Sequence, residues 1–481
     1  MDFLIKEPIT QMKKYVLLLF LSFSLYSTAQ QITLKKGAII DGIITKDSVS
    51  ETFAVYLPKA FEMSKEWPVL FIYDTKGRGK RAISMFKEAA EEQGYILAAS
   101  NNIQDSLSLS KNVLISSRMF NTLFSMVPIR RNQVYTGGYK EGARLASLIP
   151  TFIKQVKGVI SCGSAVANSE VLSSKNPFHF VGIVGVEDYN YTAMLNTEKV
   201  LNRLKFPNHL LIFEGGQDWP KSSQISRAMQ LLTLGVMAKG ELPKDEAFIE
   251  KGYKQSLGEI SRLVTENKPL LANKLLQEMI EGYRLLKNVD SLKLSGKTLR
   301  KTRQFKNANR ALNQVFFKET FIKEDYVYYL EEDIVTYNYN NLGWWKYQME
   351  KLQEYEKAIN KYEKQMGQRL KGFINALIAD NIDIAKSQEP ADEEAMNFLW
   401  MLSTITDVSA YQSYLNIISY NAKIEDYGTA LFYLEELLKN GYTDKAELYS
   451  LEHTALFRIM PQFNKVVAKY LKDSRYDVIE Q

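Results

Sequence analysis

The amino-acid sequence predicts an α/β domain with a mostly parallel sheet covered by helices on both faces, followed by an all-helical domain. Three observations support this prediction. Between Gln31 and about Met237, continuous apolar runs alternate with amphipathic helices, which is typical of strands buried on both faces. An antiparallel hairpin opens this part of the chain. After Gly240-Glu-Leu-Pro243 no strand-like run appears and helical periodicity takes over.

The first 29 residues are predicted to form a signal peptide. Met12-Lys13-Lys14 gives a charged start, Tyr15 to Leu25 is a short apolar run, and Ser27-Thr28-Ala29 supplies small residues for cleavage. Translation from Met12 would make residues 1–11 an extension. An uncleaved anchor is the alternative, although the run is short for a membrane span. We therefore expect an exported protein, periplasmic or secreted, with no span after cleavage.

Composition excludes several classes of function. The 481 residues suffice for two or three domains, and a net charge of +6 without a long basic block gives no reason to expect nucleic-acid binding. Cys162 is the only cysteine, so internal disulfides are excluded. No cofactor and no metal site are predicted.

Residues 30–240 are assigned to the α/β domain, element by element. Asp41-Gly42 favours a tight hairpin turn. Further strands are predicted at 52–57, 68–73, 95–99, 132–137, 156–162, 180–185 and 209–213, with helices at 81–93 and 112–126.

Residues 241–481 are assigned to a helical domain. Apolar residues from Trp345 to Phe373 share one stripe and predict one long helix, while 430–438 forms another helix that ends at Asn440-Gly441. The segment 426–438 resembles one tetratricopeptide helix pair, without a strict 34-residue period along the domain. The resemblance implies a protein partner. Trp344-Trp345 is either a stacking surface for a sugar or peptide, or part of the repeat core.

The most informative motif follows the strand at 132–137. Gly138-Tyr-Lys140-Glu-Gly142 is a sharp turn into a helix, and it resembles the Gly-x-Ser-x-Gly elbow of α/β-hydrolases. Both glycines of the elbow are present. Lys140 stands where that family has its nucleophilic serine.

Two later loops extend this resemblance. Asp188 follows a buried strand, where the acid of the triad is expected. Gly215-Gly-Gln217-Asp-Trp219-Pro resembles the Gly-Gly-His-x-Trp-Pro loop of esterase-like and dienelactone-hydrolase-like proteins, with Gln217 in the histidine position. A glutamine amide does not act as a general base near neutral pH. The resemblance covers about residues 31–238, and it implies a degenerate triad of Lys140, Asp188 and Gln217.

No other histidine is expected to replace the missing base. His179 and His209 begin strands, whereas the chemistry of such a sheet lies at the carboxyl ends of its strands. His453 belongs to the helical domain. Ser164, beside the sheet, remains an alternative nucleophile.

Further residues are candidates for the pocket. The loop 76–81 follows the strand that ends near Asp74, and the resemblance implies that it supplies an oxyanion-hole amide; a solvated turn is the alternative. The predicted pocket residues are Asp74, Gly77, Arg78, Glu187 and Trp219. Lys140 is read either as a reactive amine or as a structural residue that pairs with Asp188 or Glu187.

These observations predict an exported, catalytically inactive α/β-hydrolase-like protein that binds a protein partner through its helical domain. Two alternatives stay open. One is an active serine-type esterase with a non-standard nucleophile. The other is a periplasmic carbohydrate- or peptide-binding accessory protein that binds its ligand in the pocket at the degenerate triad.

Overall fold

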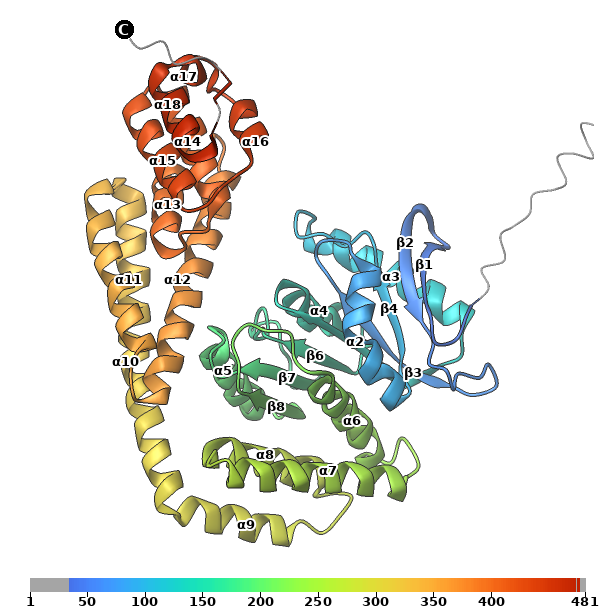
Figure 1. Ribbon diagram of the computed structural model, residues 1–481. Coiled ribbons are helices and arrows are strands. Elements are labelled where there is room, and N and C mark those ends of the chain that lie inside the picture. Colours follow the sequence, from blue (N-terminus) through green and yellow to red (C-terminus); the bar gives the residue numbers. More distant parts are fainter. Residues whose placement is uncertain (1–33, 473, 476–481) are drawn as a thin grey trace, which may run out of the picture.

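The computed structural model describes residues 34–472 and 474–475, so the predicted signal peptide and the start at Met12 lie outside the described residues (Figure 1). Across the described residues, no helix is long and apolar enough to cross a membrane. Eight strands form one sheet, with these bounds: β1 (Ile39–Thr45), β2 (Ser48–Tyr56), β3 (Trp67–Tyr73), β4 (Ile96–Ser100), β5 (Ile129–Tyr139), β6 (Gly158–Cys162), β7 (His179–Gly185) and β8 (Asn208–Phe213).

The sheet has the α/β-hydrolase topology. Its strand order is β1-β2-β4-β3-β5-β6-β7-β8. The first two strands run antiparallel to their neighbours, and β3 to β8 pair in parallel. The predicted fold class is confirmed.

Helices cover both faces of this sheet. On one face lie α2 (Gly79–Gln93) and α6 (Ser222–Ala238); on the other lie α3 (Leu109–Met126), α4 (Glu141–Phe152) and α5 (Tyr191–Arg203). Along β3, Leu70 and Ile72 belong to one core, whereas Val69 and Phe71 belong to the other. Because both faces are buried, each of these side chains contributes about 1.5–3 kcal/mol by leaving water, which explains the continuous apolar run.

The Asp41-Gly42 pair does not form the hairpin turn. It lies inside β1, where the register shifts between Ile40 and Ile43, and the turn comes later, between Thr45 and Ser48. Gly42 has φ +73°. The Asp-Gly pair predicted a turn because glycine readily adopts a positive φ. In the structure, that positive φ belongs to a β-bulge inside β1.

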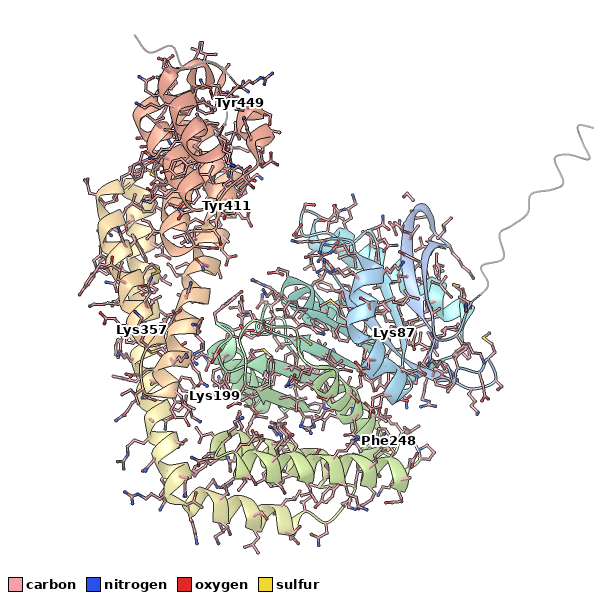
Figure 2. All side chains as sticks on the ribbon, in the orientation of Figure 1. Lys87, Lys199, Phe248, Lys357, Tyr411 and Tyr449 are labelled. Atoms are coloured by element: carbon pink, nitrogen blue, oxygen red, sulfur yellow. The ribbon has the colours of Figure 1, made fainter. Side chains whose placement is uncertain are left out.

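The hydrophobic core does not end near Gly240, where the secondary structure changes. Three helices, α7 (Glu246–Thr265), α8 (Pro269–Tyr283) and α9 (Asp290–Lys301), add Ile249, Leu276 and Leu292 to the core of α2 and α6. Phe248 on α7, labelled in Figure 2, packs against the same core. The first part of the predicted helical domain is therefore continuous with the α/β domain.

The remaining helices form an arm beside the sheet (Figure 1). Long helices run alongside the α/β domain, and shorter helices form the far end of the arm. The arm contains α10 (Arg303–Thr336), the 3-10 turn η1 (Tyr339–Asn341), α11 (Leu342–Glu356), α12 (Lys361–Ser387), α13 (Glu393–Thr406), α14 (Tyr411–Lys423), α15 (Tyr427–Lys439), α16 (Lys445–Ser450), α17 (Ala455–Ile459) and α18 (Pro461–Leu471).

Two expectations about the arm need correction. The single helix from Trp345 to Phe373 is wrong: α11 ends at Glu356, and the Asn360 side chain caps α12 by accepting a hydrogen bond from Tyr362 N. Ile359, placed on the apolar stripe, is fully exposed between the two helices. In addition, α10 alone has 34 residues, as many as a whole tetratricopeptide helix pair. The segment 426–438, predicted to be a helix pair, is one helix: it comprises the N-cap residue Asp426 and most of α15.

Candidate functional site

The elbow between β5 and α4 has a strained backbone. Lys140, at the corner, has φ 50° and ψ −119°. A residue with a side chain adopts such angles at a cost of about 1–3 kcal/mol, and it does so mainly where the surroundings fix the turn. Lys140 N donates to Cys162 O at 2.9 Å, and Arg144 N donates to Lys140 O at 2.9 Å. The side chain of Lys140 is thus presented at the carboxyl end of the sheet.

The two glycines of the elbow are required by packing. A Cβ on Gly138 would lie 2.5 Å from the carbonyl carbon of Gly142, and a Cβ on Gly142 would lie 2.1 Å from Tyr73 O. Real Cβ atoms do not approach backbone so closely, so α4 could not begin this near β3 with larger residues. This requirement is independent of the residue at position 140.

Asp188 lies in the loop after β7 and is 2% exposed. Its Oδ1 accepts a hydrogen bond from Asn190 N at 2.8 Å. Burial raises the pKa of Asp188 to about 6, against the opposing effects of the Asn190 hydrogen bond, the charge of Lys140 and the nearby Gln217 side chain.

Gln217 lies between Lys140 and Asp188. Its Oε1 is 3.5 Å from Lys140 Nζ, a long hydrogen bond, and its side chain is near enough to Asp188 to lower the pKa of that carboxyl. The three residues that the resemblance assigned to a triad therefore lie near one another at this edge of the sheet.

The expected ion pair between Lys140 and a carboxylate does not form. Among the described residues, no salt bridge joins Lys140 to Asp188 or to Glu187. The Gln217 amide is long enough to fill the gap that an absent imidazole was expected to leave open. Lys140 therefore acts on Asp188 through its charge rather than by direct contact.

The loop that carries Gln217 is held by contacts that do not involve the Gln217 side chain. Tyr139 donates its hydroxyl to the main-chain carbonyl of Gln217. The Trp219 ring packs edge-on against Tyr139 at 5.1 Å and against Phe86 at 5.2 Å between centroids. The position of residue 217 thus depends on its backbone and on its neighbours.

A cleft of about 580 Å³ opens beside the elbow. Of the predicted pocket residues, Asp74, Arg78 and Trp219 line it together with Lys140, whereas Gly77 and Glu187 are not among its lining residues. Asp74 is engaged locally: it pairs with Arg78 at 2.9 Å and accepts a hydrogen bond from Lys76 N at 2.8 Å. These contacts favour a locally closed turn over an anion cradle.

One wall of the cleft comes from the arm. Asp380 and Asp383 on α12 line it opposite the elbow. Burial raises the pKa of Asp380 above its ordinary value, and the carboxylates of Asp383 and Glu141 add to the rise against the opposing charge of Arg144. Sequence reasoning missed both aspartates, because nothing in the pattern of α12 indicates which part of the chain it packs against.

Among the described residues, no histidine lies beside the alternative nucleophile, Ser164. Ser164 donates its hydroxyl to Ala165 O at 3.2 Å. His209 Nδ1 is 2.8 Å from Glu278 Oε2, and the His179 ring lies 5.2 Å from that of His209, both at the amino ends of β7 and β8. His453 lies between α16 and α17. In the described part of the chain, no group of three or more potential metal ligands is present.

The site makes a prediction about pH. Asp188→Asn is expected to stabilise the protein at neutral pH, because the folded-state pKa of about 6 lies above the ordinary 3.8. In the unchanged protein, the free-energy cost of burying the Asp188 charge is absent below about pH 4, develops between pH 4 and 6 and is complete above pH 6. A shift of two pKa units corresponds to a cost of about 2–3 kcal/mol. Urea unfolding of both proteins at pH 4 and 7.5 measures the difference in their free energies of unfolding. Equal pH dependence in the two proteins would contradict the prediction.

Comparisons with solved structures give matches over about two fifths of the chain. Est1E from Butyrivibrio proteoclasticus is 13% identical, with a TM-score of 0.32, over 39% of this chain and 95% of that chain. An acetyl ester-xyloside bifunctional hydrolase from Caldicellulosiruptor lactoaceticus is 14% identical, with a TM-score of 0.36, over 44% and 99%. FphF, a fluorophosphonate-binding serine hydrolase from Staphylococcus aureus, is 13% identical, with a TM-score of 0.33, over 41% and 99%. No protein-family model and no curated protein matches the sequence.

Proposed function

We propose that this protein is an exported α/β-hydrolase-like protein without esterase activity, which acts as a binding or scaffold protein. One observation supports the proposal: the Gln217 side chain contacts Lys140 and acts on the pKa of Asp188, so the three positions that the resemblance assigns to a triad lie near one another without a serine or a histidine. An ammonium group that donates toward Gln217 has no lone pair with which to attack a carbonyl. The amide neither takes up a proton from a nucleophile nor returns one to a leaving group.

We predict catalytic silence. Loss of nucleophile and base removes most of the rate enhancement of such a triad and leaves only binding and any oxyanion stabilisation. Purified residues 30–481 should hydrolyse short-chain aryl esters no faster than the Asp188→Asn variant, and a fluorophosphonate probe should leave the protein unlabelled. Stoichiometric labelling of Ser164, or of any other serine, would show an active serine hydrolase instead.

The arm offers a surface for a protein partner. A groove of about 600 Å³ between α10 and α11 is lined by aromatic residues, including Phe317, Phe321, Tyr329 and Trp344. Phe317 and Phe321 are 69% and 51% exposed and touch edge-on at 4.7 Å between ring centroids. Adjacent exposed aromatic side chains are typical of the anchor sites of protein interfaces.

The charge of this surface indicates the partner's chemistry. The groove adjoins a second hollow along α10, of about 540 Å³, that shares Phe317. Four cations line the two together, Lys306, Arg310, Lys318 and Lys351, against the single carboxylate of Asp325. We therefore propose that the partner presents an acidic segment with apolar anchors, bound along α10.

Peptide selection tests this surface. Peptides selected on the mature protein from a random displayed library should be acidic and should carry aromatic or aliphatic residues. Phe317→Ser with Phe321→Ser should weaken their binding by about tenfold or more, because both anchors are lost. The matched control is Phe152→Ser with Leu285→Ser, which changes two similarly exposed residues elsewhere. Selected peptides that are neutral or basic, or that bind both double variants equally, would refute the proposed surface.

A further inference from the structure

A second cavity lies beneath the edge of the sheet, apart from the cleft at Lys140. It measures about 720 Å³, within the range of small-molecule sites, and is bounded by β8, α6, α7 and α8. No residue lines both this cavity and the cleft. Phe213, Leu263, Leu271 and Leu275 give it apolar walls, and charged side chains line the rest.

Most of these charges neutralise one another. Arg262 pairs with Glu259 at 2.7 Å and with Glu266 at 2.5 Å. Lys268 pairs with Glu266 at 2.6 Å and with Glu214 at 2.5 Å. The remaining carboxylate, Glu278, pairs with Lys274 at 2.7 Å and contacts His209 at 2.8 Å. Every carboxylate that lines the cavity therefore has a basic partner.

Arg227 on α6 is different. It lines the cavity and is partly buried, but no hydrogen bond or ion pair joins it to any described residue, and Glu259 acts on it only at a distance. Burial lowers the pKa of Arg227, which reports the cost of its desolvated charge. The buried Arg369 shows how this chain treats a guanidinium elsewhere: it donates to Glu319 and to Val186 O.

The other cations of the cavity do not all lack carboxylates. Lys274 pairs with Glu198, outside the lining, as well as with Glu278, so the five lining cations are matched by five carboxylates. Of the two lining arginines, Arg262 is paired, whereas Arg227 has no carboxylate partner among the described residues. A carboxylate matches the planar guanidinium fork, and the leucine walls favour an apolar body behind the charged end.

We infer that this cavity binds a small monocarboxylate with an apolar body, whose carboxylate pairs with Arg227. The inference does not depend on whether the cleft at Lys140 is catalytic. The ligand carboxylate would supply hydrogen-bond acceptors to Arg227, which has none among the described residues. Glu319 supplies such acceptors to Arg369. An uncharged analogue lacks the ion pair, and inorganic phosphate lacks the apolar body.

Thermal unfolding of the mature protein with a panel of probes tests the inference. Octanoate and phenylacetate should raise the melting temperature with increasing concentration, whereas 1-octanol and inorganic phosphate should not. Arg227→Met should weaken octanoate binding by about tenfold to a hundredfold, as expected for the loss of charged hydrogen bonds. The same change should raise the melting temperature of the ligand-free protein, because it removes an unpaired and partly buried charge.

Two further variants sharpen the test. Arg227→Lys keeps the charge without the fork and should bind octanoate with intermediate affinity. Arg284→Met, which removes an exposed arginine paired with Glu281 at 3.2 Å, should bind like the unchanged protein. The inference is overturned if neither carboxylate raises the melting temperature, if phosphate binds as well as octanoate, or if octanoate affinity is the same in Arg227→Met.

Discussion

Arg369→Met is expected to lower the free energy of unfolding by about 3–5 kcal/mol, the range for breaking a buried ion pair from one side. Arg369, on α12, is fully buried, and its Nη2 lies 2.6 Å from Glu319 Oε2 on α10. Removing the guanidinium leaves the Glu319 carboxylate, 1% exposed, with Lys323 as its remaining cation at 2.9 Å. Most of the expected loss comes from this incompletely paired carboxylate.

This ion pair also joins the arm to the α/β domain. Arg369 Nη1 donates to Val186 O at 2.7 Å, directly before the loop of Glu187 and Asp188. The rings of Tyr191 on α5 and Phe316 on α10 lie 5.5 and 5.6 Å from the guanidinium carbon. Arg369→Met should therefore also loosen the acid loop, which hydrogen exchange of Glu187 and Asp188 would report as faster exchange.

The double variant Arg369→Met with Glu319→Leu is the informative comparison. It removes both charges of the fully buried pair and leaves only Lys323, whose side chain is 17% exposed, without its carboxylate, so it should recover much of the lost stability. Arg284→Met is the surface control and should change stability by less than about 0.5 kcal/mol. Urea unfolding followed by circular dichroism gives all three values. A loss below about 1 kcal/mol in Arg369→Met, or a double variant no more stable than the single one, would contradict this account.

The sequence predicts those parts of the fold that local physical chemistry determines. The parallel strands could be read because both faces are buried, so that Val69 to Ile72 are all apolar. The elbow could be read because packing demands glycine at positions 138 and 142 whatever lies between them.

Contacts between distant segments could not be read in this way. Asp383 reaches the cleft from α12, and no local pattern records which surface that helix packs against. The apolar stripe through Ile359 continued the helical period, but periodicity does not show where an exposed link divides two helices. At the site, the loops of Lys140, Asp188 and Gln217 were expected at one edge, yet the contact made by the Gln217 amide depends on side-chain length and rotamer.

Lys140→Ser combined with Gln217→His is expected to introduce hydrolase activity. The strained turn already presents position 140 at the sheet edge, with φ 50°. The loop of residue 217 is held by the Tyr139 hydroxyl on its main-chain carbonyl and by Trp219, so a new imidazole should be delivered to the place of the amide. Asp188 already lies near the residue 217 side chain, which acts on its pKa, so its carboxylate is placed to orient that imidazole.

The single variants separate the two roles. Lys140→Ser alone supplies a hydroxyl without a base, and Gln217→His alone supplies a base without a nucleophile, so neither should react. The double variant should be labelled at position 140 by a fluorophosphonate probe and should cleave aryl acetates about 10²–10⁴-fold faster than Lys140→Ser, the usual contribution of a positioned general base.

Adding Asp188→Asn to the double variant tests the third member. It should remove most of the gained activity, because an asparagine favours the wrong imidazole tautomer and does not stabilise the imidazolium that forms. If the double variant folds and yet stays unlabelled, then an intact elbow with a triad does not suffice here. In that case the cleft wall formed by Asp380 and Asp383 would be the next determinant to change, since carboxylates in the same cleft as position 140 disfavour a developing oxyanion there.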